Sequence, residues 1–231
     1  MINLIYKSLA ELIGTFALVF VAVGSVNMSW AFWESLDVLG SAAASGIIVM
    51  VIVYSIGNIS GAHINPAVTA SLFVTGQIEL KNTIYYIISQ LGGAIGACLL
   101  LSYIFPSIEC GTVLGTTVLA SDITFASGIL IEAILTFALV FTIFGVAVDN
   151  RTSTKHAGII IGTIVFLDII VGGGLTGASM NPARTFGPAL VLGHWADHLV
   201  YWIGPLAGGT FAAIFYKKVF SLKTDNKTDI A

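Results

Sequence analysis

The stretch GAHINPAVT at residues 61–69 returns as GASMNPART at residues 177–185, which lie 116 positions further along a chain of 231 residues. Since the two copies lie half a chain apart, we interpret the sequence as two repeats. Each copy is typical of a helix start, because it offers an Asn to cap the helix and a Pro at the first helical position. The expected starts are Asn65, Pro66 and Ala67 in the first copy and Asn181, Pro182 and Ala183 in the second.

The composition places this chain in a membrane. Hydrophobic residues form 57% of it and charged residues only 9%, whereas soluble domains carry about 25% charged residues. The mean hydropathy is +0.98. The net charge of −3 argues against a nucleic-acid partner. The two cysteines, Cys98 and Cys110, lack the spacing of metal ligands, so we expect free thiols and no metal site.

Six apolar runs have the length of about 20 residues that crosses a hydrocarbon core of about 30 Å. They are residues 8–27, 40–57, 82–105, 125–148, 156–175 and 198–220. Two shorter apolar stretches, residues 65–75 and 181–192, are opened by the repeated phrase. At a rise of 1.5 Å per residue each reaches about 15 Å, or half of the core, so we expect re-entrant half-helices.

A second repeated string supports the division into two repeats. ELIGTFALVF at residues 11–20 returns as EAILTFALVF at residues 132–141. Each repeat then has three spans and one half-helix, and because three is odd the second repeat is inverted in the membrane relative to the first. The half-helices enter from opposite faces, and their N-termini meet near the midplane. We expect one all-α membrane domain over residues 1–231, made of repeat one (1–105), a loop (106–124), repeat two (125–220) and a tail (221–231).

The distribution of basic residues predicts the orientation. With six spans, one side of the membrane holds eight basic residues and the other side only Arg184, which places both termini in the cytoplasm. The eight are Lys7, Lys81, Arg151, Lys155, Lys217, Lys218, Lys223 and Lys227. Arg184 therefore breaks a strong topological bias and needs a functional reason.

The segments before the half-helices, residues 57–64 and 173–180, are rich in glycine and lie at membrane depth. We interpret them as irregular backbone, which is tolerated at that depth only when it is buried in protein or lines water. Water there would meet the amides of Asn65 and Asn181 and two helix N-termini, each carrying about +0.5 of a charge. The sequence thus predicts a narrow conduit for neutral molecules that form hydrogen bonds, one that excludes ions and protons.

These motifs resemble the aquaporin, or major intrinsic protein, family. The two Asn-Pro-Ala phrases, HINPAVT at 63–69, NPARTFGP at 181–188 and the opening AELIGTF at 10–16 carry the resemblance, which covers nearly the whole chain. It implies a plasma-membrane homotetramer with one pore in each subunit, passive flow and no cofactor. It also implies the roles of several residues. Asn65 and Asn181 orient water, Arg184 forms the outer constriction, His63 lines the pore, and Glu11 and Glu132 support the loop backbones.

The resemblance further implies a selectivity filter of Ser45, Ile169, Ala178 and Arg184. With serine where strict water channels have a bulky aromatic residue, this ring is wide and has one apolar wall, which suits glycerol. Thr185, Ala189 and the pair Tyr201-Trp202 instead resemble the water-selective branch. We therefore expect a channel for water that also passes small uncharged solutes. A facilitator mainly for glycerol is the alternative.

Asp168 is the one mid-span acid without an assigned role. It is either a hydrogen-bonded interior acid or a residue that tunes the neighbouring filter position Ile169. A coupled secondary transporter also uses inverted repeats and broken helices, and Asp168 would be its only candidate coupling site. Ser/His/Asp sets, metal clusters and paired carboxylates are missing from the sequence pattern, so we do not expect an enzyme.

Overall fold

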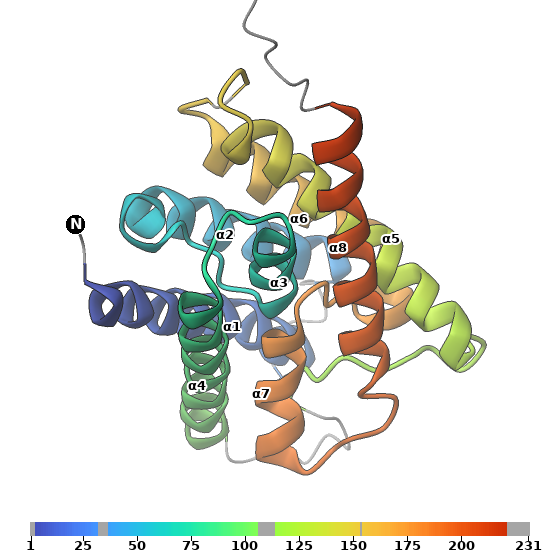
Figure 1. Ribbon diagram of the computed structural model, residues 1–231. Coiled ribbons are helices and arrows are strands. Elements are labelled where there is room, and N and C mark those ends of the chain that lie inside the picture. Colours follow the sequence, from blue (N-terminus) through green and yellow to red (C-terminus); the bar gives the residue numbers. More distant parts are fainter. Residues whose placement is uncertain (1–2, 32–36, 106–113, 153, 221–231) are drawn as a thin grey trace, which may run out of the picture.

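The computed structural model describes residues 3–31, 37–105, 114–152 and 154–220 (Figure 1). Regular structure in these ranges is helical. The elements are α1 (Leu4–Ala31), α2 (Val38–Ser60), α3 (Pro66–Val74), α4 (Leu80–Ile104), α5 (Phe125–Ile143), a π-helical turn η1 (Phe144–Val148), α6 (Ala157–Thr176), α7 (Pro182–Leu192) and α8 (Val200–Val219). This order confirms the predicted all-α fold of six long and two short helices.

Five of the long helices, within the described ranges, are long and apolar enough to cross a membrane: α1, α2, α4, α5 with η1, and α6. The sixth predicted span is α8. It has the same length as α6, 20 residues, but carries Lys217 and Lys218 in its last turn and Pro205 inside. It packs along α5 as α4 packs along α1, so α8 is the counterpart of α4 and completes six spans.

The two short helices begin where the repeated phrase predicts. Asn65 caps α3, since its Oδ1 accepts a hydrogen bond from the Ala67 amide at 2.8 Å. Asn181 caps α7, since its Oδ1 accepts from the amides of Ala183 at 3.0 Å and Arg184 at 3.3 Å. A proline occupies the first turn of each helix. With nine and eleven residues, both helices span about half of a hydrocarbon core.

The half-helices point toward each other and tie the repeats together. Asn65 Nδ2 donates to the Met180 carbonyl at 2.8 Å, and Asn181 Nδ2 donates to the Ile64 carbonyl at 2.9 Å. Because the N-terminal ends of α3 and α7 meet, the two helices run in opposite directions, as inverted repeats require. Each half-helix also packs mainly on the other repeat, α3 against α8 and α7 against α4 (Figure 1).

The irregular segments are shorter than predicted. Residues 57–60 and 173–176 belong to α2 and α6, so only residues 61–65 and 177–181 leave the helical conformation. Gly61 and Gly177 end these helices in the left-handed conformation, with φ of 93° and 82°. The expectation was wrong for Gly57 and Gly173 because backbone groups at this depth are satisfied by continuing the helix, even through glycine.

Four residues without glycine's freedom also adopt positive φ, at matching places in the two repeats: Ala62 (49°), Ile64 (45°), Ala178 (43°) and Met180 (52°). Such conformations cost about 1–3 kcal/mol each and persist only where surrounding contacts enforce them. The contacts that enforce them here come from two buried glutamates.

Glu11 on α1 holds the first segment. Its Oε1 accepts from the His63 amide at 2.9 Å and from the Ser60 hydroxyl at 2.7 Å, and its Oε2 accepts from the Ile64 amide at 2.6 Å. The amide of Gln90 on α4 donates to the same Oε2 at 2.8 Å. One carboxylate thus satisfies two backbone donors that would otherwise be unpaired inside the membrane.

Glu132 on α5 repeats this arrangement for the second segment. It accepts from the Thr176 hydroxyl at 2.7 Å and from the backbone amides of Ser179 at 2.9 Å and Met180 at 2.7 Å. Both glutamates are fully buried. In both repeats, a buried glutamate thus accepts hydrogen bonds from two consecutive amides of the motif segment.

Glycines permit the close approach of the paired long helices. A Cβ on Gly93 would lie 2.3 Å from the Leu12 carbonyl oxygen of α1, and a Cβ on Gly208 would lie 2.0 Å from the Ala133 carbonyl oxygen of α5. These contacts involve backbone, which cannot rotate away. Only glycine allows the helix spacing observed here at the two positions.

We expect Gly208→Ala to lower the thermal stability of the detergent-solubilised protein, because the added methyl group forces α5 and α8 apart at a cost of about 1–3 kcal/mol. The control is Gly174→Ala on α6, where a Cβ would meet nothing within 4 Å. Thermal unfolding followed by circular dichroism measures both. Equal melting temperatures for Gly208→Ala and the control would contradict the packing argument.

We expect Glu132→Gln to destabilise the protein by about 1–3 kcal/mol, because the amide group of Gln turns a donor toward the donating amide of Ser179 or Met180. The matched control is Glu79→Gln at the exposed start of α4, where Glu79 makes no side-chain capping bond. Thermal unfolding in detergent compares the two variants. A wild-type melting temperature for Glu132→Gln would show that the carboxylate is dispensable.

Candidate functional site

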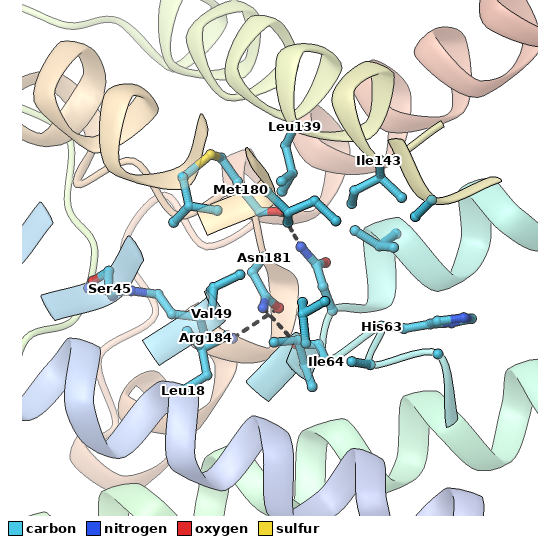
Figure 2. Close-up of a pocket in the computed structure, with 18 of the residues that line it drawn as sticks. Leu18, Ser45, Val49, His63, Ile64, Leu139, Ile143, Met180, Asn181 and Arg184 are labelled. Atoms are coloured by element: carbon cyan, nitrogen blue, oxygen red, sulfur yellow. Dashed lines mark hydrogen bonds between the residues drawn. The ribbon is translucent and has the colours of Figure 1, made fainter. Parts of the chain in front are cut away.

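A cavity of about 430 Å³ runs between the two repeats and is lined by both of their motif segments (Figure 2). Asn65 and Asn181 both line it, and each donates a hydrogen bond to a backbone carbonyl of the other repeat. Figure 2 shows Asn181 near the centre of the cavity, between Met180 and Ile64. The cavity therefore passes the meeting point of the two half-helices.

The long helices α2 and α6 line the cavity with matching stripes. Ser45, Val49 and Val53 project from α2 at a spacing of four residues, which places them on one helix face. Their counterparts 116 positions later on α6 are Ile161, Val165 and Ile169, and all three also line the cavity. The repeat seen in the sequence is therefore also seen in the cavity wall, where equivalent residues of the two repeats line it.

Helices α1 and α5 add further apolar wall. Leu18 and Leu139 occupy the same place in the repeated string that begins at Glu11 and Glu132, and both line the cavity. Sequence reasoning did not select these residues. The repeat itself was the available signal, because a residue that lines the cavity in one copy has a counterpart that lines it in the other.

Each asparagine side chain uses some of its polar groups to hold the fold and leaves one amide hydrogen for the cavity. Each Oδ1 caps its own helix, and one hydrogen of each amide group is used by the carbonyl of the opposite repeat. An amide nitrogen carries two hydrogens, so one donor of Asn65 and one of Asn181 remain for a molecule in the cavity. This division was not foreseen from the sequence.

The four predicted filter residues, Ser45, Ile169, Ala178 and Arg184, are all brought to this cavity. Figure 2 shows the side chain of Arg184 reaching toward Ser45. Ser45 and Ala178 are buried. Arg184 Nη1 donates to the Gly115 carbonyl at 2.8 Å, which fixes one side of the guanidinium and leaves several of its five N–H donors for other partners.

The repeat counterparts of these four residues carry no charge. Ser45 corresponds to Ile161, Ile169 to Val53, Ala178 to Ala62 and Arg184 to Val68, and every counterpart is an apolar residue that lines the cavity. The positive charge of the cavity thus belongs to one repeat, at a position where the other repeat has valine.

His63 lines the cavity as predicted and has a fixed orientation. Its Nδ1 lies 3.2 Å from the Thr69 hydroxyl, and its ring meets Tyr86 edge-on with 5.0 Å between the centroids. The counterpart of His63 in the second repeat is Ser179, whose hydroxyl lies 2.6 Å from that of Thr185. The two repeats therefore use different side chains for the same link between motif segment and half-helix.

Asp168 lies outside the lining of this cavity, although its neighbour Ile169 is part of it. Asp168 is buried, and its Oδ2 has no hydrogen-bond partner among the described residues. Cys98 is a buried free thiol, as expected. Cys110 and the two tail lysines, Lys223 and Lys227, lie outside the described residues.

The cavity reaches polar residues near the junction of η1 and α6. Asn150, between these two elements, lines the cavity, and so does Gln77, which follows α3. Beside Asn150, Arg151 Nη2 donates to Asp149 Oδ2 at 2.6 Å and also contacts the Phe220 carbonyl at the end of α8. The hydrogen bonds from Arg151 hold the pKa of the Asp149 carboxyl well below its usual range, so this pair stays ionised at neutral pH.

The profile of the family described as "Major intrinsic protein" matches residues 1–216. The chain is 41% identical over 218 residues to "Aquaporin TIP4-4" from Zea mays, covering 92% of this chain and 85% of that protein. It is 40% identical over 216 residues to "Aquaporin-4" from Mus musculus, covering 91% and 66%. The solved structure of the aquaglyceroporin from Plasmodium falciparum superposes with a TM-score of 0.85, covering 94% of this chain and 97% of that one.

That solved structure is 24% identical in sequence and shows the shared fold. The family profile and the relatives go further, because the profile covers nearly the whole chain and the identity reaches about four residues in ten. The chain therefore belongs to the aquaporin, or major intrinsic protein, family, and it is a water-channel protein and not an enzyme.

Proposed function

We propose that this protein is a passive channel for water that also passes small uncharged solutes such as glycerol, and that it excludes ions and protons. The observation that supports the solute permeability is the serine at position 45. This small side chain lines the cavity on α2, and the Arg184 side chain reaches toward it.

The lining of the cavity that contains Arg184 suits a polyol. The guanidinium offers hydrogen-bond donors to hydroxyl groups, while Ile169 and Ala178 offer apolar contact to the carbon chain. A molecule with one polar and one apolar face matches both kinds of wall. Water needs only the donors and the remaining amide hydrogens of Asn65 and Asn181.

Ions meet several unfavourable features along the same path. Arg184 and the two half-helix N-termini repel cations, and the apolar stretches of the wall offer few groups to replace the hydration shell of an ion of either sign. The fixed amide donors of Asn65 and Asn181 orient a water molecule between them. A water held by two donors breaks the chain of hydrogen bonds along which a proton would move.

A facilitator mainly for glycerol is the second candidate, and the apolar residue Ile169, which lines the same cavity as Arg184, favours it. A coupled transporter is less well supported. Its only candidate coupling site, Asp168, is buried and is not among the residues that line the cavity.

We also propose that the protein is a homotetramer in the plasma membrane with both termini in the cytoplasm. The basic residues Lys7, Lys81, Lys217 and Lys218 support this orientation under the positive-inside rule. Large apolar side chains such as Ile47 and Val51 are exposed on the outward face of α2, where lipid or a neighbouring subunit would cover them.

The function is tested by stopped-flow light scattering on proteoliposomes that contain the purified protein. We expect fast water efflux after an osmotic step and faster glycerol entry than into empty liposomes. Water flux without glycerol entry would contradict the solute permeability alone. The absence of both fluxes would contradict the channel assignment of the purified protein.

We expect Ser45→Phe to reduce glycerol permeability at least about tenfold, equivalent to about 1.4 kcal/mol of added barrier, and to leave most of the water permeability. The aromatic ring fills the space beside Arg184 that a polyol needs. The control is Ser55→Phe on the exposed face of the same helix. If both permeabilities stay at the wild-type value in Ser45→Phe, Ser45 is not part of the constriction.

A further inference from the structure

The segment of residues 114–117, which precedes repeat two, packs against the second copy of the repeated phrase, residues 177–185. Leu114 and Thr117 are buried, with exposed fractions of 4% and 2%. A Cβ on Gly177 would lie 2.9 Å from Thr117 Cγ2, so this segment packs directly against the turn that ends α6. Sequence reasoning gave the segment no role, because it contains no repeated phrase and no charged residue.

Two polar contacts join this segment to consecutive residues of α7. The Gly115 carbonyl accepts from Arg184 Nη1 at 2.8 Å, and the Thr117 hydroxyl lies 2.8 Å from the Thr185 hydroxyl. The first contact holds the charged group of the constriction, and the second joins the same segment to the next residue of the helix. The two contacts lie only two residues apart on the segment.

The hydroxyl contact continues as a directed chain. The Thr185 hydroxyl lies 2.6 Å from that of Ser179, and the Ser179 hydroxyl donates to the Asn181 carbonyl at 2.8 Å. Each hydroxyl has a single hydrogen. With the hydrogen of Ser179 used by Asn181, Thr185 must donate to Ser179, and Thr117 must donate to Thr185. Thr117 is therefore the first donor of a chain that ends at the capping asparagine of α7.

In repeat one, the threonine equivalent to Thr185 receives its hydrogen bond from a helix and not from a connecting segment. Thr69, the counterpart of Thr185, accepts from Gln90 Nε2 at 2.9 Å, and Gln90 also donates to Glu11. Gln90 belongs to α4, a helix of the same repeat. In repeat two the corresponding contact comes from Thr117, outside any helix. The second motif thus depends on a connecting segment where the first depends on a helix.

We propose that Thr117 is a positioning residue for Arg184. By donating to Thr185 it anchors the segment that carries the Gly115 carbonyl, and this carbonyl draws the guanidinium toward the wall and keeps the constriction open to solutes larger than water. Without the anchor the guanidinium loses its fixed acceptor and turns into the opening. This inference rests on the proposed permeability to water and small solutes.

The test compares water and glycerol permeability of Thr117→Val, Thr117→Ser and Thr116→Val in the same proteoliposomes. Valine keeps the shape of threonine but cannot donate, whereas serine restores the hydroxyl. Thr116 is a matched control, because it is the residue next to Thr117 and its own Oγ1 is buried without a hydrogen-bond partner among the described residues. We expect Thr117→Val to lower the ratio of glycerol to water permeability about two- to tenfold, the range of one hydrogen bond. Thr117→Ser and Thr116→Val should keep the wild-type ratio.

A second measurement separates positioning from general damage to the fold. Hydrogen exchange followed by mass spectrometry should show faster exchange at residues 114–117 in Thr117→Val, while peptides from α1 and α5 exchange as in the wild type. Two results would overturn the inference while leaving the proposed function intact, provided that the wild type conducts water and glycerol. One is an unchanged permeability ratio in Thr117→Val, and the other is a change of the same size in Thr116→Val. If the wild type conducts neither water nor glycerol, the proposed function fails and the inference fails with it.

Discussion

Two buried carboxylates carry the constraint on which this structure depends. Backbone groups inside a membrane must be paired, and the segments 61–65 and 177–181 leave helical pairing at that depth. Glu11 and Glu132 accept hydrogen bonds from the amides of these segments and so hold residues such as Ile64 and Met180 in strained conformations. The carbonyls of Ile64 and Met180 are thereby placed to bind the asparagine of the opposite repeat.

Much of the fold could be predicted because the repeated phrases mark two helix starts and also show that the two halves of the chain are related. Asn65 and Asn181 are helix caps by local chemistry alone, and the odd number of spans between them dictates the inversion. The continuation of α2 through Gly57 and of α6 through Gly173 could not be predicted from glycine's propensity. Propensity measured in water does not include the cost of an unpaired backbone group in an apolar environment, and that cost extends the helices.

The site was predictable where a residue breaks a pattern. Arg184 is the one basic residue against the charge bias, and Ser45, Ile169 and Ala178 follow from the resemblance; all four reach the cavity. The segment 114–117 was not predictable, because its contacts with Arg184 and Thr185 join residues 69 and 68 positions apart with no repeated motif. Nor could the sequence show that Asn65 and Asn181 each donate one amide hydrogen to a backbone carbonyl of the other repeat.

The difference between Arg184 in one repeat and Val68 in the other has a consequence for the direction of flow. The cavity wall is nearly two-fold symmetric, yet among the described residues that line it the charged side chain, Arg184, belongs to one repeat. For a neutral solute the height of a barrier along a fixed path is the same from either end, so this asymmetry cannot make such a channel a one-way valve. Net flow follows the concentration or osmotic gradient alone and stops when that gradient is gone, whichever half of the cavity carries the charge. As the passive channel proposed above, the protein would speed equilibration across the membrane and would give the cell no capacity to accumulate a solute.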